Sequence, residues 1–491
     1  MRSPALHLPL EDDYARKLEG FHVPWKGDEV PSPRILLFNA ELAGELGLPG
    51  ELESSEGAQL LCGASVPAGA RPVAMAYAGH QFGQFAPQLG DGRALLLGEI
   101  RDPAGKLRDL HLKGSGPTPF SRGGDGKAAL GPVLREYLMG EAMHALGIPT
   151  TRALAAVLTG EPVYRESPQP GAVLARVAAS HLRVGSLEFA AARGRVADLR
   201  RLADYAISRH DPDLADRPDR YLAFLERVAE RQAQLVARWM HAGFVHGVMN
   251  TDNVTLSGET IDYGPCAFVD RYAPDTVFSS IDRDGRYAFG NQPAILVWNL
   301  ARMAEALLPL IDEDSRRAVE RASEVIRTVP DRYRHHWLAG MRQKLGLTTA
   351  EDEDAALIDD LLECMHRGGA DYTLAFRHLS DVLRGANGPF LDLFSHPRQA
   401  REWLERWQAR LAREPQTAEA RAADMDRVNP LYIPRNHLVE AALSAAVEGD
   451  LAPFRRLLAV VRQPFTVQPE ADAHASPPPD DFGPFVTYCG T

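Results

Sequence analysis

The sequence predicts an α/β (α+β) protein with two lobes, a smaller one built on a β-sheet and a larger helical one. Two strand patterns separated by a turn lie within residues 89–113, whereas residues 290–465 carry the apolar spacing of successive helices. The chain has 491 residues, of which 45% are hydrophobic and 24% charged. It can therefore bury the core that two or three packed lobes require.

The first 70 residues are expected to form an extension wrapped on this core. They alternate turn signals with one clear helix, residues 39–46, which Gly47 and Pro49 end.

A strand, a turn and a second strand follow the extension. The turn at residues 90–93 opens the apolar run 94–100, and the turn at residues 102–105 separates it from the alternating run 107–113. These segments predict a small β-sheet.

A single helix and another strand come next. Pro132 fits the first turn of a helix that continues to Leu146, where Gly147 and Pro149 end it. Residues 172–177 then form an apolar strand.

A long helix precedes the most informative loop of the chain. Residues 221–241 carry apolar side chains at the spacing of a buried helix face, Gly243 ends the helix, and the loop begins at His246. The order of elements is that of a bilobal protein-kinase-like fold with N-terminal and C-terminal extensions. The expected divisions are an N-terminal extension at 1–70, a kinase-like N-lobe at 71–185, a helical C-lobe at 186–465 and a flexible C-terminal tail at 466–491.

The loop from His246 has the outline of a kinase catalytic loop. Such a loop reads His-x-Asp with an Asn five residues further on, and a hairpin then brings an Asp-x-Gly to a metal. Asn253 and Asp262 fill the metal-binding positions, but Val248 stands where the base is expected. Valine cannot accept a proton, so the chain is either an inactive kinase or an enzyme with Asp252 as its base.

Asn253 and Asp262 predict a site for Mg²⁺ or Mn²⁺. An amide oxygen and a carboxylate are ligands that a hard cation takes when nucleotide phosphates fill its remaining positions. The alternative is that both residues only cap turns of the backbone.

Cations and glycines upstream predict a nucleotide site. Lys113 ends a strand and Glu136 lies on the following helix, so the two can form an ion pair that aims the ammonium at phosphate. Gly90 and Gly92 suit a nucleotide loop or a plain hairpin turn. Residues 114–131 are rich in glycine, which fits a flexible linker or a loop against the nucleotide, and their location between Lys113 and the helix favours the nucleotide loop.

Arg176 and Arg183 lie near the expected boundary between the lobes. A guanidinium can bind two phosphate oxygens at once, whereas adenine needs only backbone groups. The alternative is a pair of structural salt bridges.

Several long segments together resemble the selenoprotein O family, whose members have a protein-kinase-like fold, and the similarity runs nearly end to end. They are residues 37–43, 77–85, 113–126, 246–253, 262–265 and 429–436. The resemblance implies a protein adenylyltransferase that binds ATP in an orientation flipped relative to kinases and transfers AMP to hydroxyl side chains of proteins.

The resemblance also assigns residues. Nucleotide contacts fall on Gly90, Gly92, Arg93, Lys113, Asp125, Gly126, Arg176 and Arg183. Asn253 and Asp262 hold the metal, Asp252 accepts the proton, and Glu136 pairs with Lys113. The selenocysteine near the C-terminus of some family members is Cys489 here.

The four cysteines are too few and too scattered for a disulfide framework or a zinc site. Cys266 and Cys489 are nevertheless a candidate regulatory disulfide, because a thiol on a mobile tail can reach one on a surface loop.

Charge and apolar patterning predict the partners and the compartment. A net charge of -12 argues against nucleic acid or an anionic membrane as a partner, and no apolar run suggests a signal peptide or membrane span. The cytoplasm is expected. Three functions stay open: transfer of AMP from ATP, or of UMP from UTP, to proteins; a kinase acting on a small molecule or a protein; and a non-catalytic pseudokinase that binds nucleotide.

Overall fold

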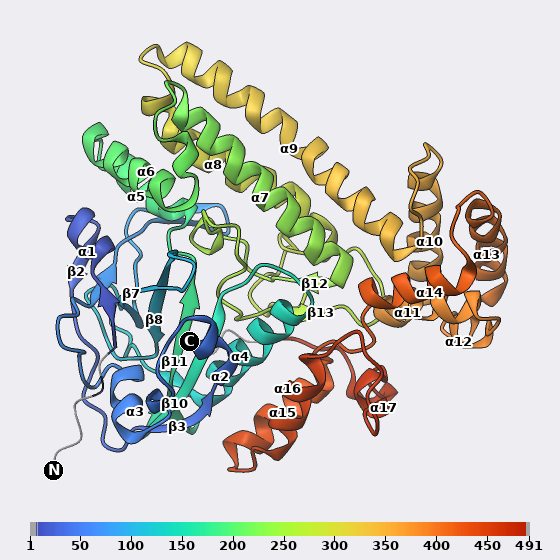
Figure 1. The fold of residues 1–491 in the computed structure, drawn as a ribbon, viewed down its shortest axis with the longest axis horizontal. Coiled ribbons are helices and arrows are strands. Elements are labelled where there is room, and N and C mark those ends of the chain that lie inside the picture. The colour runs from blue at the N-terminus through green and yellow to red at the C-terminus, as the bar shows by residue number, and fades with distance from the viewer. Residues whose placement is uncertain (1–5, 7, 488–491) are drawn as a thin grey trace.

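The computed structural model describes Leu6 and residues 8–487, and a nine-stranded sheet dominates their first third (Figure 1). The strand order is β2-β4-β7-β8-β11-β10-β3, with β1 paired to β7, β9 paired to β11, and every pairing antiparallel. Its strands are β1 (Leu10–Glu11), β2 (His22–Pro24), β3 (Arg34–Phe38), β4 (Val73–Met75), β7 (Ala94–Arg101), β8 (Leu107–Lys113), β9 (Ala128–Ala129), β10 (Arg152–Tyr164) and β11 (Pro168–Ala178). The predicted mixture of helix and sheet is confirmed.

The N-terminal segment belongs to this sheet as well as packing on it. The predicted helix is present as α2 (Ala40–Glu45), which the Asn39 side chain caps by accepting a bond from Leu42 N. Strands β1, β2 and β3 were not expected, because runs of two to five residues carry too little alternation to be recognised. Strand β10, absent from the prediction, pairs with both β3 and β11.

Alternation along the strands separates an apolar face from a polar one. On β8, Leu110 and Leu112 join an apolar cluster with α2 and α3 (Ser55–Leu61). His111 and Lys113 point to the opposite face, which α4 (Leu130–Ala145) covers. Side chains two residues apart share a face, so a strand rich in leucine still presents cations to one side of the sheet.

The helical part packs around the predicted long helix, observed as α7 (Arg220–Ala242). Its predicted apolar face is buried, and Gly243 ends it with a positive φ of 72°. Short elements near the later loops are β5 (Gly79–Gln81), β6 (Gln84–Ala86), β12 (Phe244–Val245) and β13 (Ala267–Phe268). The remaining helices of eight residues or more are α5 (Val184–Ala192), α6 (Val196–His210), α8 (Gln292–Ile311), α9 (Ser315–Lys344), α10 (Asp354–Gly368), α11 (Tyr372–Leu383), α13 (Pro397–Leu411), α14 (Ala418–Val428), α15 (Asn436–Val447) and α16 (Ala452–Val461).

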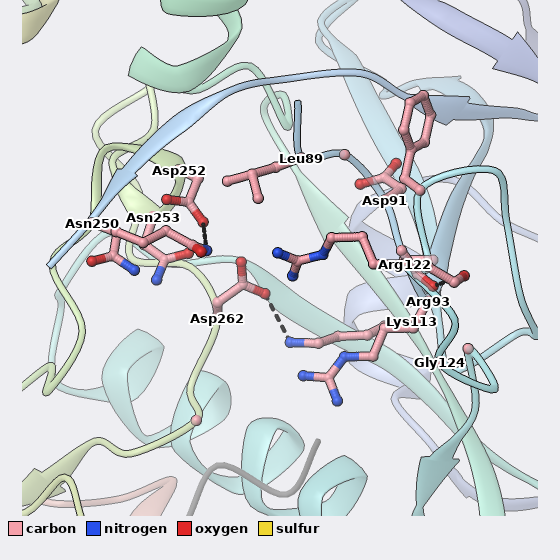
Figure 2. Close-up of a pocket in the computed structure, with 18 of the residues that line it drawn as sticks. Leu89, Asp91, Arg93, Lys113, Arg122, Gly124, Asn250, Asp252, Asn253 and Asp262 are labelled. Carbon is pink, nitrogen blue, oxygen red and sulfur yellow. Dashed lines mark hydrogen bonds and ion pairs between the residues drawn. The ribbon is translucent and has the colours of Figure 1, made fainter. Parts of the chain in front are cut away.

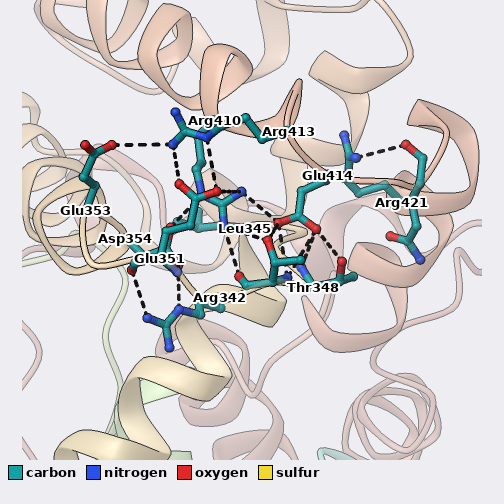
Figure 3. A network of polar contacts seen from close by, with 12 residues as sticks. Arg342, Leu345, Thr348, Glu351, Glu353, Asp354, Arg410, Arg413, Glu414 and Arg421 are labelled. Carbon is teal, nitrogen blue, oxygen red and sulfur yellow. Dashed lines mark hydrogen bonds and ion pairs between the residues drawn. The ribbon is translucent and has the colours of Figure 1, made fainter.

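Two groups of helices extend from this core (Figure 1). The end of α9 and helices α10, α11, α12 (Gly388–Leu391), α13 and α14 share a second apolar cluster built around Trp403 and Trp407. A polar network joins the end of α9 to α10 and α13: Asp354, the first residue of α10, bonds Arg342 at 2.7 Å and Arg410 at 2.8 Å, and Arg410 also bonds Glu414 at 2.8 Å (Figure 3). Helices α15 and α16 instead return to pack on α4, which brings the C-terminal part of the chain beside the sheet.

Residues Phe289–Ile311, which include α8, are long and apolar enough to cross a membrane by length and composition alone. The apolar window is 56% buried inside the protein, against α5, α7 and α9. The segment is therefore accounted for as a core helix.

Lys344, the last residue of α9, is buried without a carboxylate at ion-pair distance among the described residues. Its ammonium lies 4.3 Å from the ring centroid of Phe376 and 5.8 Å from that of Tyr372. Burial lowers the pKa of Lys344 to about 7. Between that value and the ordinary 10.5, the unfolded chain binds this proton more readily, so this residue's contribution to stability rises with pH across that window.

We predict that Lys344→Met raises the free energy of unfolding by about 1–3 kcal/mol near pH 6, because it removes an unpaired buried charge. The advantage should shrink as the pH approaches about 9, where the folded protein holds Lys344 neutral. Urea denaturation at several pH values measures this, with the exposed Lys106→Met as control. A stability difference that does not change with pH would contradict the prediction.

Candidate active site

A cleft of about 510 Å³ lies between the sheet and the loops that follow α7. Figure 2 shows cations from the sheet facing carboxylates and amides from the loops across it. The structure brings together in its lining Gly90, Gly92, Arg93, Lys113, Asp125, Gly126, Arg176, Arg183, Asp252, Asn253 and Asp262. Glu136 lies behind them on α4 and is buried.

Three cations converge on the carboxylate of Asp262. Its Oδ1 lies 2.8 Å from Lys113 Nζ and 2.7 Å from Arg176 Nη1, and its Oδ2 lies 3.5 Å from Arg183 Nη1. Burial alone would raise the pKa of Asp262, but Lys113, Arg176 and Arg183 outweigh burial and hold the pKa well below its usual range. Asp262 is therefore ionised in the folded protein.

Glu136 holds two of these cations from behind. Its Oε2 lies 2.6 Å from Lys113 Nζ and its Oε1 lies 2.8 Å from Arg176 Nη1. Lys113 and Arg176 are thus each shared between Glu136 and Asp262. With both carboxylates charged, the cluster of three cations and two anions keeps one net positive charge, which favours an anionic ligand.

Asp252 lies on the other side of Arg183 and is 8% exposed. Gln81 Nε2 donates to its Oδ2 at 3.3 Å, and Arg183 Nη1 donates to its backbone oxygen at 2.9 Å. Asp252 Oδ1 and Arg183 Nη2 are buried and have no hydrogen-bond partner in the described part of the chain. Burial raises the pKa of Asp252 to about 6. A carboxylate oxygen and a guanidinium nitrogen beside the cleft are thus left without a hydrogen bond in the described part of the chain.

The loop that carries these groups is fixed by His246 and Asn253. His246 Nε2 lies 2.9 Å from Ile261 O and its Nδ1 accepts from Val248 N at 3.4 Å, which requires the neutral imidazole with its proton on Nε2. Burial lowers the pKa of His246, which favours this form. Asn253 Nδ2 donates to Val248 O at 3.0 Å, so its Oδ1 is the atom left for a metal or substrate.

Asp262 holds an unusual backbone conformation. Its φ is 61°, in the left-handed region that non-glycine residues seldom adopt. Gly264 N donates to Asp262 O at 2.9 Å, closing a tight turn. The surrounding structure holds this strained turn in place, and the turn presents the carboxylate to the three cations.

The glycines that were predicted to contact nucleotide have a packing role. A Cβ on Gly90, whose φ is 134°, would lie 2.5 Å from the Phe120 ring, and a Cβ on Gly92 would lie 2.9 Å from Phe120 O. A Cβ on Gly126 would lie 2.2 Å from the Gly116 backbone carbon. These glycines let the turn at residues 90–92 and the loop at residues 116–126 fold against each other at the edge of the cleft.

Asp125 is held by Arg165, a residue that the sequence did not single out. Arg165 Nη1 lies 2.7 Å from Asp125 Oδ2, and its Nη2 lies 3.2 Å from Oδ1. The hydrogen bond and charge of Arg165 lower the pKa of Asp125. Arg165 follows β10, which the sequence prediction also lacked, so its approach to the loop could not be expected.

The hairpin β5–β6 supplies other contacts that the prediction lacked. Phe82 N donates to Asn250 Oδ1 at 3.0 Å, and His80 N donates to Thr251 Oγ1 at 2.7 Å. The hairpin therefore covers the loop of Asp252. Its residues belong to the segment 77–85, which carried a family resemblance but no assigned role.

Cys266 was expected on a surface loop, but this was wrong: the residue is fully buried, and burial raises the pKa of its thiol to about 11. Arg135 Nη2 donates to Cys266 O at 2.6 Å, and Thr487 Oγ1 donates to Pro265 O at 2.9 Å. Thr487, at the end of the described chain, thus lies beside the residue preceding Cys266. The predicted partner, Cys489, falls outside the described residues.

Gly79 offers a direct test of the hairpin's role. A Cβ at this position would lie 2.4 Å from Asp252 Oδ1. We predict that Gly79→Ala lowers catalytic activity at least about tenfold with a small change in melting temperature, because the hairpin or the carboxylate must move. The matched control is Gly44→Ala on α2, where a Cβ meets nothing within 4 Å. Equal activity of the two variants would contradict the prediction.

Comparison with known proteins identifies the family. Residues 4–462 match the model of the family described as protein adenylyltransferase SelO. A protein named protein nucleotidyltransferase YdiU from Cereibacter sphaeroides (strain KD131 / KCTC 12085) is 61% identical over 98% of this chain and 99% of its own length. A protein of the same name from Rhizobium leguminosarum bv. trifolii (strain WSM2304) is 56% identical over 99% of this chain and 97% of its own length. Another, from Rhizobium etli (strain CIAT 652), is 54% identical over 99% of this chain and 98% of its own length. The chain belongs to the protein adenylyltransferase SelO family.

Proposed function

We propose that this protein transfers AMP from ATP, or UMP from UTP, to serine, threonine or tyrosine hydroxyls of other proteins and releases pyrophosphate. The observation that carries the proposal is the pairing of Asp252, whose Oδ1 lacks a partner among the described residues, with the cations around Asp262 in one cleft. Val248 fills the place of a kinase base, so a different acceptor is needed. The order of sheet, helix α4, helix α7 and loop supports a bilobal protein-kinase-like fold with terminal extensions.

The cations are suited to the triphosphate. Lys113 and Arg176 are shared between two carboxylates, and Arg183 has a buried Nη2 to offer. Phosphate oxygens entering here would replace water and bind donors that are already oriented. With the β- and γ-phosphates held by these cations, the α-phosphorus is left to face the acceptor, which is the flipped orientation implied by the family.

Asn253 and Asp262 would hold Mg²⁺ or Mn²⁺. Their donor atoms are oxygens, as these cations prefer, and both residues line the cleft. Among the described residues, no cluster of three or more His, Cys, Asp or Glu could hold a metal, and phosphate oxygens and water would complete the shell around Asn253 and Asp262. When bound, the cation neutralises charge on the phosphates.

Asp252 is positioned to take the proton from the acceptor hydroxyl. The hydroxyl oxygen forms a bond to the α-phosphorus as the bond to the bridging oxygen breaks, and pyrophosphate leaves with that electron pair. Lys113, Arg176 and Arg183 stabilise the charge that develops on the leaving pyrophosphate. The side-chain oxygen of the protein substrate then carries the AMP group.

We further propose that the protein works in the cytoplasm on ATP and protein substrates, without nucleic acid or membrane as partners. Its net charge of -12 supports this, because a general attraction to polyanions requires the opposite sign.

The decisive experiment follows ATP labelled separately at the α- and γ-phosphates, with Mg²⁺ or Mn²⁺ and a cell lysate. We predict that α label appears on protein. Asp252→Asn should lower transfer by about 10²-fold or more through loss of the proton acceptor, and Asp262→Ala should abolish it. Asp424→Asn on the surface of α14 is the control and should be fully active.

Two outcomes would overturn the proposed reaction, and a third would overturn the metal assignment. Label from the γ-phosphate on protein or on a metabolite would show a kinase. Nucleotide binding without any transfer would show a pseudokinase. Full activity of Asp262→Ala would refute the metal assignment.

We also propose that Cys266 and Cys489 form a regulatory disulfide. The contact of Thr487 with Pro265 supports it, because it brings the tail to the segment that carries Cys266. We predict that mild oxidation yields a Cys266–Cys489 cross-linked peptide on a non-reducing map and that dithiothreitol removes it. Cys364→Ser should retain the cross-link, and a map without it after full oxidation would refute the pairing.

A further inference from the structure

Three buried polar side chains form a hydrogen-bonded chain that ends at the cleft. Asp91, His111 and Arg176 are 3%, 0% and 3% exposed. His111 Nε2 lies 3.0 Å from Asp91 Oδ2, and Arg176 Nε lies 3.3 Å from His111 Nδ1. Asp91 belongs to the glycine turn before β7, His111 to β8 and Arg176 to β11. Asp91 and Arg176 both line the cleft, and His111 joins them from β8.

The direction of the bonds follows from the groups at the two ends. Arg176 can only donate, so His111 Nδ1 must accept from it. His111 then carries its proton on Nε2 and donates to Asp91. Burial lowers the pKa of His111, which favours this neutral form. Asp91 thereby selects the one tautomer of His111 that can bind Arg176.

Strand register explains why these residues meet. Arg176 is paired with His111 in the antiparallel ladder between β8 and β11, so their side chains share a face. With Nε held by His111, the guanidinium turns Nη1 to Glu136 at 2.8 Å and to Asp262 at 2.7 Å. Lys113, two residues after His111 on the same face of β8, meets the same two carboxylates.

Hydrogen bonds to β4 and to the glycine-rich loop hold Asp91 in place. Its Oδ2 accepts from Met75 N at 3.0 Å, and its own amide donates to Met75 O at 2.9 Å. Its carbonyl oxygen accepts from Thr118 Oγ1 at 2.6 Å. The glycine turn, β4 and the glycine-rich loop thus set the position of Asp91 and, through His111, that of Arg176.

We propose that Asp91 and His111 are positioning residues that orient Arg176 for the triphosphate. This inference rests on the proposed function in one respect: the nucleotide of that function supplies the phosphate that Arg176 would bind. A long arginine side chain loses much rotamer freedom when it binds a ligand, and the relay removes that freedom in advance. The turn that carries Gly90 and Gly92 therefore acts on the nucleotide site through a buried side chain of its own.

His181 provides a matched control that separates the proposed role of His111 from simple packing. His181 is as buried as His111, stacks on it at a centroid distance of 4.2 Å, and binds Asp109 at 3.1 Å. Its ring makes no hydrogen bond to Arg176 in the described structure. Loss of either imidazole should disturb packing in a similar way, but only loss of His111 should release Arg176.

The test compares His111→Asn with His111→Gln in the full-length protein. Asparagine can place an amide oxygen near Nδ1 and keep the acceptor for Arg176, whereas glutamine can place an amide nitrogen near Nε2 and keeps only the donor to Asp91. We expect the dissociation constant for MgATP, measured by calorimetry, to rise at least about tenfold in His111→Gln and less than about threefold in His111→Asn. His181→Gln should leave it unchanged even where the melting temperature falls.

Equal weakening in the two His111 variants, or in His181→Gln, would overturn the relay. Should His111→Gln fail to fold, Arg176→Lys supplies the second route, since lysine has no Nε to be held. His111→Ala, which removes the acceptor for Nε, should weaken ATP binding in the wild-type background and have no further effect when added to Arg176→Lys, and an equal loss in both backgrounds would overturn the relay. Because binding is measured without transfer, absence of α label on protein would refute the proposed reaction and leave this result standing.

Discussion

The carboxylate of Asp262 and the three cations around it are the interaction on which the rest of the site depends. Lys113, Arg176 and Arg183 come from two strands and the segment after them, whereas Asp262 comes from a loop far along the chain. Like charges so close together and so buried would repel one another strongly without the carboxylates. Asp262 and Glu136 therefore make the cation cluster stable, and the cluster in turn keeps Asp262 charged.

The alternation of side chains along the strands allows the sheet to carry these charges on one face. Alternation sends Leu110 and Leu112 to the apolar face and His111 and Lys113 to the cleft. The same rule applies to Arg176 on β11, opposite His111. A strongly apolar sheet can thus support a dense set of charges on one face, provided that each charge has a partner.

Much of the site could be predicted from local spacing. Lys113 at a strand end, Glu136 on the next helix, and Asn253 nine residues before Asp262 all reflect short-range geometry that a sequence displays. The helices α2, α4 and α7 were also predicted, since caps and apolar periodicity mark them. The domain boundaries remain a prediction.

Contacts between distant segments could not be predicted in this way. Gln81 reaches Asp252 across 171 residues, and nothing near either residue in sequence indicates it. Strand β10 was absent from the prediction, and with it the approach of Arg165 to Asp125. His111 received no role in the sequence prediction, and only the register between β8 and β11 shows that it holds Arg176.

We propose that Asp262 organises the three cations before nucleotide and metal bind. Calorimetric titration of ATP into wild-type protein and into Asp262→Asn, once with excess EDTA and once with Mg²⁺, tests this role. Without metal, the variant should bind ATP more tightly, because the carboxylate no longer competes with phosphate for Lys113, Arg176 and Arg183. With Mg²⁺, wild-type protein should gain affinity and the variant should not. Weaker binding by Asp262→Asn in EDTA, or the same gain from Mg²⁺ in both proteins, would contradict the account.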